Sequence, residues 1–282
     1  MPRILIAGCG YVGAATGDLF HQAGWTVEGW TSSAAAAAAL LGKPYPVIAV
    51  DITNRDQVNS RAENFDFIIH CASTRGGDAQ RYREVYLNGV RNLLDRFVGS
   101  TLLFTSSTSV YAQTGGEWVT EESPVEPIHD GGRVLKETER LVLGRGGIVA
   151  RLAAIHGPGR SALLKKFLSE EAVIDPTFDR FTNQVHRDDV APALLRITDP
   201  GIPPASIYNV VDDTPIRQSE CYRWLARKLG RPIPPPGKGA DPKRGRSNKR
   251  VSNRKLRQMG WTPQYPSFPD AMEKNILPSF GL

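Results

Sequence analysis

The sequence contains little cysteine, since only Cys9, Cys71 and Cys221 occur in 282 residues, and they lie far apart. An odd number of widely spaced cysteines indicates neither a disulfide framework nor a metal site, and suits a reducing compartment. The chain also lacks an apolar run of about 18 residues, which a membrane-spanning helix needs. Its start has no signal-peptide pattern of basic, apolar and small-residue regions. We therefore expect a cytoplasmic protein with no membrane partner.

A glycine motif is the most informative feature that is present. Gly8-Cys9-Gly10-Tyr11-Val12-Gly13 follows the apolar residues 4–7 and precedes a helix-like stretch over 14–22. In the pattern G-x-G-x-x-G the first glycine permits a tight turn, the second lets the backbone approach phosphates, and the third lets the helix pack closely. We predict that Gly8, Gly10, Tyr11, Val12 and Gly13 hold the pyrophosphate of a dinucleotide at the positive end of that helix.

Strand and helix signals alternate along the first half of the chain, as a doubly wound parallel sheet requires. The predicted fold class is therefore α/β, a Rossmann doubly wound parallel sheet, followed by a small C-terminal substrate subdomain. The expected strands are 3–7, 25–31, 47–50, 65–70, 102–105, 147–152 and 207–211, and the expected helices include 12–23, 33–41 and 79–97. Right-handed crossovers bring the C-terminal ends of the strands to one edge, where ligands bind.

The end of the second strand bears on the choice of cofactor. An acid there would bind a ribose 2′-hydroxyl and repel a 2′-phosphate. The chain has Thr31, Ser32 and Ser33 instead, with Glu28 placed too early and no arginine at that point. Because three hydroxyls can donate to a phosphate, we predict NADP in preference to NAD. Further predicted cofactor contacts are Asp51 and Ile52 for the adenine, Cys71, Ala72 and Ser73 for the ribose and pyrophosphate, and also Thr105 and Ser106.

Basic residues are concentrated in one segment. Between Lys238 and Arg257 stand nine Lys or Arg and a single acid, Asp241, a net charge of +8 in a chain whose total is +6. Two interpretations are open: a solvated surface loop, or an electrostatic clamp over an anionic group such as a substrate phosphate or a cofactor 2′-phosphate. No aromatic stacking platform accompanies the charge, which argues against nucleic-acid binding.

The run Thr105-Ser106-Ser107-Thr108-Ser109-Val110-Tyr111 places hydroxyls at the ligand edge, where they can orient a carbonyl or an alcohol. Together with RLAAIHGPGR (151–160), VHRDD (185–189), IYNVVDD (207–213) and KRVSNRKL (249–256), it resembles the extended short-chain dehydrogenases/reductases of the NAD(P)-dependent epimerase/dehydratase superfamily. The chain is most similar to the atypical branch of that group. The resemblance implies that Ser107 positions the substrate oxygen. The alternative is a turn-capping hydroxyl without a catalytic role.

The chain departs from this family at the Tyr-x-x-x-Lys dyad, in which the tyrosine is the general acid/base and the lysine lowers its pKa. Lys136 is the candidate lysine, but Gly132 stands four residues before it. If Glu139 sets the register instead, Leu135 and Gly131 occupy the two positions. The tyrosine is missing on either register. Lys136 is thus predicted either as a catalytic lysine or as an exposed helix lysine.

Another group would then have to move the proton. Three of only five histidines, His129, His156 and His186, fall in segments that the resemblance brings to the substrate side. Because histidine titrates near neutrality, we predict His156 as the acid/base. We also predict substrate contacts from Tyr111, His129, Arg160 and His186. The alternatives are hydrogen-bonded structural histidines and, for Tyr111, packing.

From about residue 157 the prolines cluster and the predicted elements become short. The resemblance implies an NAD(P)-binding Rossmann domain over 1–156 and a mostly substrate-binding subdomain over 157–282, with late Rossmann elements (about 185–213) interleaved. It also implies that 249–253 and the basic segment line the substrate cleft. A homodimer through a helix bundle built from 79–97 and 133–143 is a further implication.

Two classes of function remain open. The first is an NAD(P)-dependent oxidoreductase, epimerase or dehydratase acting on a small molecule that is phosphorylated or linked to a nucleotide. The second is a catalytically impaired NADP-binding sensor or scaffold. The missing tyrosine favours the second class. Ser107 and an arginine-rich cleft favour the enzyme, which is our prediction.

Overall fold

A seven-stranded sheet forms the centre of the computed structural model, which describes residues 1–74, 76–238 and 247–282. The strand order is β11-β7-β5-β4-β1-β2-β3, and every pair is parallel. The chain runs outward from β1 to β3 and returns to β4 on the other side of β1, so the order reverses there. The strands are β1 Arg3–Ala7, β2 Thr26–Thr31, β3 Val47–Ala49, β4 Phe67–His70, β5 Thr101–Ser107, β7 Ile148–Leu152 and β11 Ile207–Val210.

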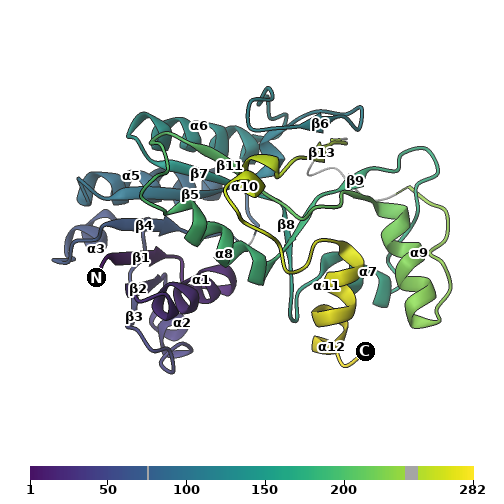
Figure 1. Cartoon of the computed structure of the whole chain (residues 1–282), viewed down its shortest axis with the longest axis horizontal. Coiled ribbons are helices and arrows are strands. Elements are labelled where there is room, and N and C mark those ends of the chain that lie inside the picture. Colours follow the sequence, from purple (N-terminus) through teal and green to yellow (C-terminus); the bar gives the residue numbers. More distant parts are fainter. Residues whose placement is uncertain (75, 239–246) are drawn as a thin grey trace.

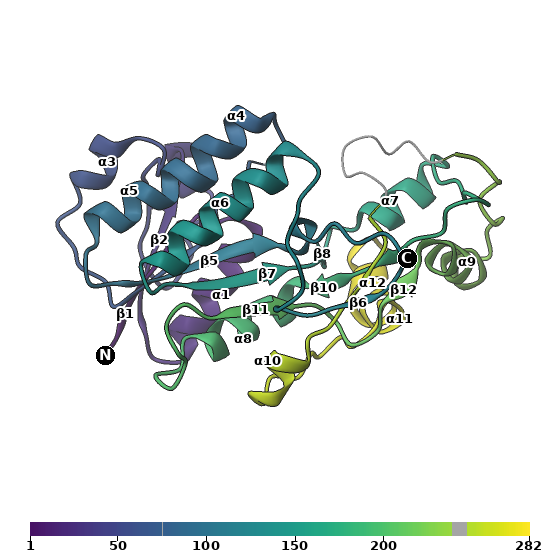
Figure 2. The same cartoon turned by 90° about the horizontal axis from the view of Figure 1, so that it is seen from above.

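Helices cover both faces of this sheet (Figure 1 and Figure 2). Helices α1 and α8 pack together on one face, and α5 and α6 lie on the other. The sheet is therefore buried on both sides, as parallel sheets require. The helices of this part are α1 Tyr11–Gln22, α2 Ala34–Ala38, α3 Arg55–Asn59, α4 Ala79–Tyr82, α5 Gly89–Arg96, α6 Asp130–Gly144 and α8 Arg187–Ile197.

The helix predicted over 79–97 contains a wide turn. Between α4 and α5 the segment η1, Arg83–Asn88, is a π-helix. Within it, the carbonyl oxygen of Val85 lies 3.2 Å from Nε2 of His70, the last residue of β4. A side chain that bonds a helix carbonyl is an identifiable cause of such a departure from α-helical geometry.

The Ala-rich helix predicted over 33–41 is shorter than expected. The structure has α2 over Ala34–Ala38 only, followed by turns, and none of its residues is buried. Helix propensity alone does not hold a helix of this length in water, and no packed face extends it. The predicted bounds of β1, by contrast, are those observed.

A second hydrophobic core lies beside the sheet, at the right of Figure 1. It is built from α7 Ala162–Leu168, α9 Gln218–Leu229, α11 Phe268–Ala271 and the π-helix η3 Met272–Ile276. Val190 of α8 and Val210 of β11 belong to the first core instead. The remaining elements are η2 Thr108–Val110, β6 Trp118–Val119, β8 Ala154–His156, β9 Phe181–Thr182, β10 Gln184–His186, β12 Ile216–Arg217, β13 Arg250–Val251, α10 Arg254–Gln258 and α12 Leu277–Ser279.

Within the described part of the chain, no helix combines the length and apolar character needed to cross a membrane. The same residues contain no group of three His, Cys, Asp or Glu placed to hold a metal ion.

Candidate functional site

The glycine turn after β1 is shaped by backbone contacts that exclude side chains. A Cβ on Gly8 would lie 2.2 Å from the nitrogen of Ala72, and Gly8 has a φ of +102°. A Cβ on Gly13 would lie 2.2 Å from the carbonyl oxygen of Gly8. Gly10, in contrast, has nothing within 4 Å of its Cβ position. Two of the glycines are therefore required by the protein itself, whereas Gly10 borders open space.

The amides at the start of α1 face this space without a competing group. The Gly10 N-cap makes no side-chain hydrogen bond, and the first turn contains no acid. The unpaired N–H groups and the helix dipole together form a site for an anion. Because Gly8 touches Ala72 directly after β4, this turn lies where the strand order reverses, which is the ligand position in open α/β sheets. These residues fit the pyrophosphate of a dinucleotide.

Of the three hydroxyls predicted to bind a 2′-phosphate, one is buried and two are exposed. Thr31 is buried, and its hydroxyl donates to the carbonyl of Ser33 at 3.1 Å. The Ser33 hydroxyl accepts the amide of Ala36 at 3.3 Å, which caps α2. Ser32 and Ser33 are exposed. The structure thus leaves Ser32 and Ser33, but not Thr31, accessible to a ligand.

Other side chains near β2 and β3 are engaged by their own segments. Glu28 is buried and accepts the indole N–H of Trp30 at 2.7 Å, so it does not reach the end of β2. Asp51 accepts the amide and the hydroxyl of Thr53 at 2.9 and 2.8 Å. Ile52 is buried against α5. Adenine binding by Asp51 and Ile52 remains a prediction.

The hydroxyl groups at the end of β5 form hydrogen bonds with different parts of the structure. Thr105 donates to the carbonyl of His70 at 2.7 Å, and the buried Ser106 donates to Glu139 at 2.6 Å. Ser107 is half-buried, and its hydroxyl accepts the amide of Ser109 at 3.2 Å. A hydroxyl that accepts one bond can still donate its proton. Ser107 therefore caps a turn and still presents a donor at the edge, so both roles predicted for it are compatible with its geometry.

A buried polar network stands behind this run, and it includes Tyr111. Arg151 pairs with Glu139 at 2.8 Å and donates to the hydroxyl of Tyr111 at 2.8 Å. Tyr111 in turn donates to Asn209 at 2.9 Å and is 1% exposed. The predicted substrate contact of Tyr111 does not fit this position, because its hydroxyl is engaged by Arg151 and Asn209 and its ring is enclosed, with the guanidinium of Arg151 over it. The alternative, packing, describes it.

The first turn of α6 shows what replaces the family dyad. Lys136 is half-buried and lines a surface hollow, whereas Leu135 is buried. Glu139 faces inward with Leu135, so the register set by Glu139 describes which side of the helix faces the sheet. Lys136 remains a candidate catalytic lysine, and it would have to act from this hollow. The hollow around Lys136 is lined by Glu126, Pro127, Arg133, Glu137 and Arg140.

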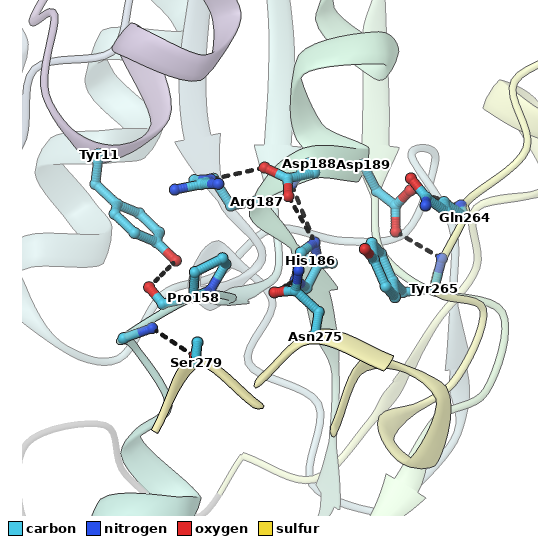
Figure 3. Close-up of polar contacts among 11 residues, drawn as sticks. Tyr11, Pro158, His186, Arg187, Asp188, Asp189, Gln264, Tyr265, Asn275 and Ser279 are labelled. Atoms are coloured by element: carbon cyan, nitrogen blue, oxygen red, sulfur yellow. Dashed lines mark hydrogen bonds and ion pairs between the residues drawn. The ribbon is translucent and has the colours of Figure 1, made fainter. Parts of the chain in front are cut away.

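The three predicted histidines have different surroundings. His129 is the N-cap of α6, and its Nδ1 accepts the amide of Gly132 at 2.9 Å. His186 is fully buried: its Nδ1 accepts the amide of Asp188, and its Nε2 lies 3.0 Å from Oδ1 of Asn275 (Figure 3). The neutral ring thus carries its proton on Nε2, and burial lowers the pKa of His186. His129 and His186 therefore act as caps and links within the protein.

His156 differs from these two. It is 3% exposed, its ring centroid lies 5.8 Å from that of His186, and neither of its ring nitrogens has a hydrogen-bond partner among the described residues. Burial, and then the neighbouring His186, lower the pKa of His156 to about 3. The imidazole is therefore neutral at physiological pH. It can accept or donate one hydrogen bond, but it is a weak base.

Two arginines flank the tyrosine of the glycine turn. The guanidinium carbons of Arg160 and Arg187 lie 5.1 and 4.9 Å from the ring centroid of Tyr11, whose hydroxyl donates to the carbonyl of Pro158 at 3.1 Å (Figure 3). Arg187 also pairs with Asp188 at 2.7 Å. Sequence reasoning missed Arg187, although a cation directly after His186 in VHRDD was the available signal. Positive charge is thus held next to the glycine turn.

Asp189 fastens the C-terminal segment to α8. Its carboxylate accepts the amides of Gln264 and Tyr265 at 2.6 and 3.0 Å (Figure 3). Burial raises the pKa of Asp189 to about 6, against these two bonds. The ring of Tyr265 lies on His186, with centroids 3.9 Å apart. The segment after α10 is therefore held against the same corner of the sheet as the loop after β8.

The basic segment divides between described and undescribed residues. Residues 239–246, which carry part of its charge, lie outside the described residues. Lys249 is buried and donates to the carbonyl of Tyr111 at 2.8 Å. Arg250 stacks on Trp118 and Phe181. Because Lys249 and Arg250 are engaged in contacts within the protein, the predicted electrostatic clamp would have to use other residues of the basic segment.

Comparisons with known proteins agree on the fold. Residues 4–131 match the model of the NAD dependent epimerase/dehydratase family. No curated protein matches the chain. A protein of Methylobacillus flagellatus described as an NAD-dependent epimerase/dehydratase shares 26% identity, with a TM-score of 0.83 over 100% of this chain and 99% of its own.

Two structures with ligands in their descriptions are similar in fold. UDP-glucose 4-epimerase of Thermotoga maritima, with UDP-glucose, has a TM-score of 0.81 at 17% identity, over 96% of each chain. dTDP-glucose 4,6-dehydratase of Bacillus anthracis, in complex with NAD, has a TM-score of 0.80 at 15% identity, over 98% of this chain and 96% of its own.

Proposed function

We propose that this chain, a member of the extended short-chain dehydrogenase/reductase-like proteins of the NAD-dependent epimerase/dehydratase group, binds NADP in preference to NAD and acts on a small nucleotide-linked or phosphorylated substrate. The reaction class is an epimerase, dehydratase or reductase. A bound nicotinamide would supply or take up a hydride at the substrate carbon. Ser107 would donate a hydrogen bond to the oxygen on that carbon.

The observation that carries this proposal is the uncovered glycine turn. Gly10 borders open space, and the amides of α1 lack a side-chain cap. The turn touches Ala72 at the reversal of strand order, and Ser107 ends the next strand of the sheet after β4. A dinucleotide and an oxygen-bearing substrate would therefore share one edge.

The preference for an anionic substrate rests on Arg160 and Arg187. Both lie on the ring of Tyr11, and Arg160 is exposed. Guanidinium groups bind phosphate oxygens well because they donate paired N–H groups in a planar fork. UDP-glucose and dTDP-glucose, which carry a diphosphate, are the first probes to test.

Gly10→Ala tests the dinucleotide site without disturbing the fold. Because a Cβ at Gly10 meets no protein atom within 4 Å, the melting temperature should stay that of the parent, while the Kd for NADPH should rise by about tenfold or more. Fluorescence titration measures the Kd. Gly42→Ala is the matched control, since its Cβ position is equally open and lies outside the site. Equal NADPH affinity in the parent and Gly10→Ala would contradict the proposal.

Ser107→Ala tests turnover. In single-turnover measurements of nicotinamide absorbance with NADP⁺ or NAD⁺ and UDP-glucose or dTDP-glucose, the parent should form reduced cofactor, and the variant should be slower by about tenfold or more. The Kd for the dinucleotide should not change. Equal rates in the two proteins would remove Ser107 from the reaction.

The second candidate function is a dinucleotide-binding sensor or scaffold without turnover. The observation that favours it is the pair Gly131 and Gly132, because the segment that opens α6 supplies no tyrosine four residues before Lys136. Tight NADPH binding by the parent, with no change in nicotinamide absorbance for either probe, would support this function over the enzyme.

A further inference from the structure

Two tyrosines from another helix lie beside the glycine pair that opens α6. A Cβ on Gly131 would lie 2.9 Å from Cε1 of Tyr82. The rings of Tyr82 and Tyr86 are in contact, with centroids 5.1 Å apart. The ring of Tyr82 thus fills the position that a side chain at residue 131 would take, whereas Pro127 and His129 fill that position at Gly132.

Tyr86 reaches the cofactor edge of the sheet. The groups that lower the pKa of its phenol are the side chain of Ser73 and the side chain and backbone of Thr74, which places the phenolic end of Tyr86 near these two residues. These residues directly follow Ala72, which touches Gly8 of the glycine turn. Ser73 is exposed, so the phenolic end of Tyr86 lies at an accessible part of the loop.

The π-turn η1 determines where this phenol lies. His70 contacts the carbonyl of Val85, the residue before Tyr86, at 3.2 Å. The ring of Tyr86 packs against His70 and Phe104, at centroid distances of 6.0 and 6.2 Å. His70 of β4 and Phe104 of β5 are paired with each other in the sheet, near the ends of the strands where ligands bind. π-turns inside α-helices occur frequently at functional sites, where they re-aim a side chain.

Two other phenols near this edge give their protons to the protein. Tyr11 donates to the carbonyl of Pro158, and Tyr111 donates to Asn209. Tyr86 instead has Ser73 and Thr74 as neighbours, and both lower the pKa of its phenol. Burial raises the pKa of Tyr86, whereas the bonds from Ser73 and Thr74 oppose this by stabilising the phenolate.

We propose that Tyr86 is the acid/base of the reaction, so that a phenol from η1 replaces the tyrosine that α6 lacks. This inference rests on the proposed function. In the direction of reduction, the phenol gives its proton to the substrate carbonyl oxygen as the carbon receives a hydride. The carbonyl becomes an alcohol, and the phenolate left on Tyr86 takes a proton from solvent beside Ser73. Oxidation of an alcohol follows the same path in reverse.

The first test needs no turnover. A phenol close to the nicotinamide should ionise more easily when the oxidised, positively charged ring is bound, so the ultraviolet absorbance of tyrosinate should appear at lower pH with NADP⁺ than with NADPH. We expect the pKa of one phenol to fall by about one unit in the parent. The shift should be absent in Tyr86→Phe and retained in Tyr82→Phe, the neighbouring phenol.

The second test measures rate. Tyr86→Phe should lower single-turnover reduction of NADP⁺ with UDP-glucose or dTDP-glucose by about 100-fold or more, with less than about a threefold change in Kd for NADPH. Tyr82→Phe should stay within about threefold of the parent in both. If the tyrosinate shift persists in Tyr86→Phe, the inference is overturned while the proposed function stands. If the parent binds no dinucleotide, both are overturned.

Discussion

The two halves of the ligand edge use their polar groups in opposite ways. At the ends of β1 and β4, the groups that face the ligand are backbone amides of α1, and Gly10 leaves them uncovered. At the ends of β5 and β7, the polar side chains mostly bond one another, as Ser106, Glu139 and Arg151 do. Cofactor binding therefore depends on space that is kept open, whereas the reaction side depends on a buried network that holds β5 in place.

This difference teaches why the two halves tolerate change differently. A backbone site survives changes of side chain, provided that no Cβ enters the turn. A buried ion pair does not survive the loss of one partner, because the remaining charge is left desolvated.

The largest effect is expected from Glu139→Ala. Removing a carboxylate that is 3% exposed would leave the guanidinium of Arg151 buried without its partner, and the free energy of unfolding should fall by about 3 to 5 kcal/mol. Urea denaturation measures this change. Glu137→Ala, which removes an exposed partner of Arg83 on the same helix, should cost about 1 kcal/mol or less. Similar losses from the two variants would remove the contrast between the network and the surface.

The next largest effect is a loss of stability at low pH, which we expect from His70 at the end of β4. Burial lowers the pKa of His70 to about 4 from its ordinary value of 6.5. A histidine whose folded pKa is depressed stabilises the fold above its unfolded pKa and loses that contribution as pH falls. The loss should be roughly 3 kcal/mol between pH 6.5 and pH 4.

His70→Gln should remove this part of the acid dependence, measured by urea denaturation across that pH window. His21→Gln, at an exposed position of α1, should follow the parent curve. Part of the acid loss should remain in His70→Gln because His156 also has a lowered pKa. An unchanged pH profile in His70→Gln would show that His70 does not contribute in this way.

The smallest effect is a change in the preference between NADH and NADPH. Ser32→Asp places an acid at the exposed end of β2, where it would bind a ribose 2′-hydroxyl and repel a 2′-phosphate. The ratio of the Kd for NADH to that for NADPH should fall by about tenfold, measured by fluorescence titration of both cofactors. The parent should bind NADPH more tightly than NADH. A ratio in Ser32→Asp equal to that of the parent would place the adenosine ribose elsewhere.

Much of the cofactor side could be predicted because its physics is local. Apolar runs identify parallel strands buried on both faces, and the spacing of Gly8, Gly10 and Gly13 identifies a turn that needs no side chain. The reaction side could not be predicted in the same way. Thr105, Ser106 and Ser107 look equivalent in the sequence, yet they differ in whether the hydroxyl bonds another strand, a helix or the local turn.

The sequence alone determined the Rossmann class, the glycine turn and the absence of the Tyr-x-x-x-Lys pair, because periodicity and the permitted backbone angles of glycine are properties of short segments. Only the tertiary structure decided that Lys136 lines a surface hollow, that Tyr111 is enclosed and that Tyr86 lies near the loop after β4. Tyr111 is held by Arg151 of β7 and Asn209 of β11, whereas the position of Tyr86 depends on contacts between β4, η1 and α6. One of them, the contact of His70 with Val85 in the π-turn, leaves no mark in the periodicity of either segment.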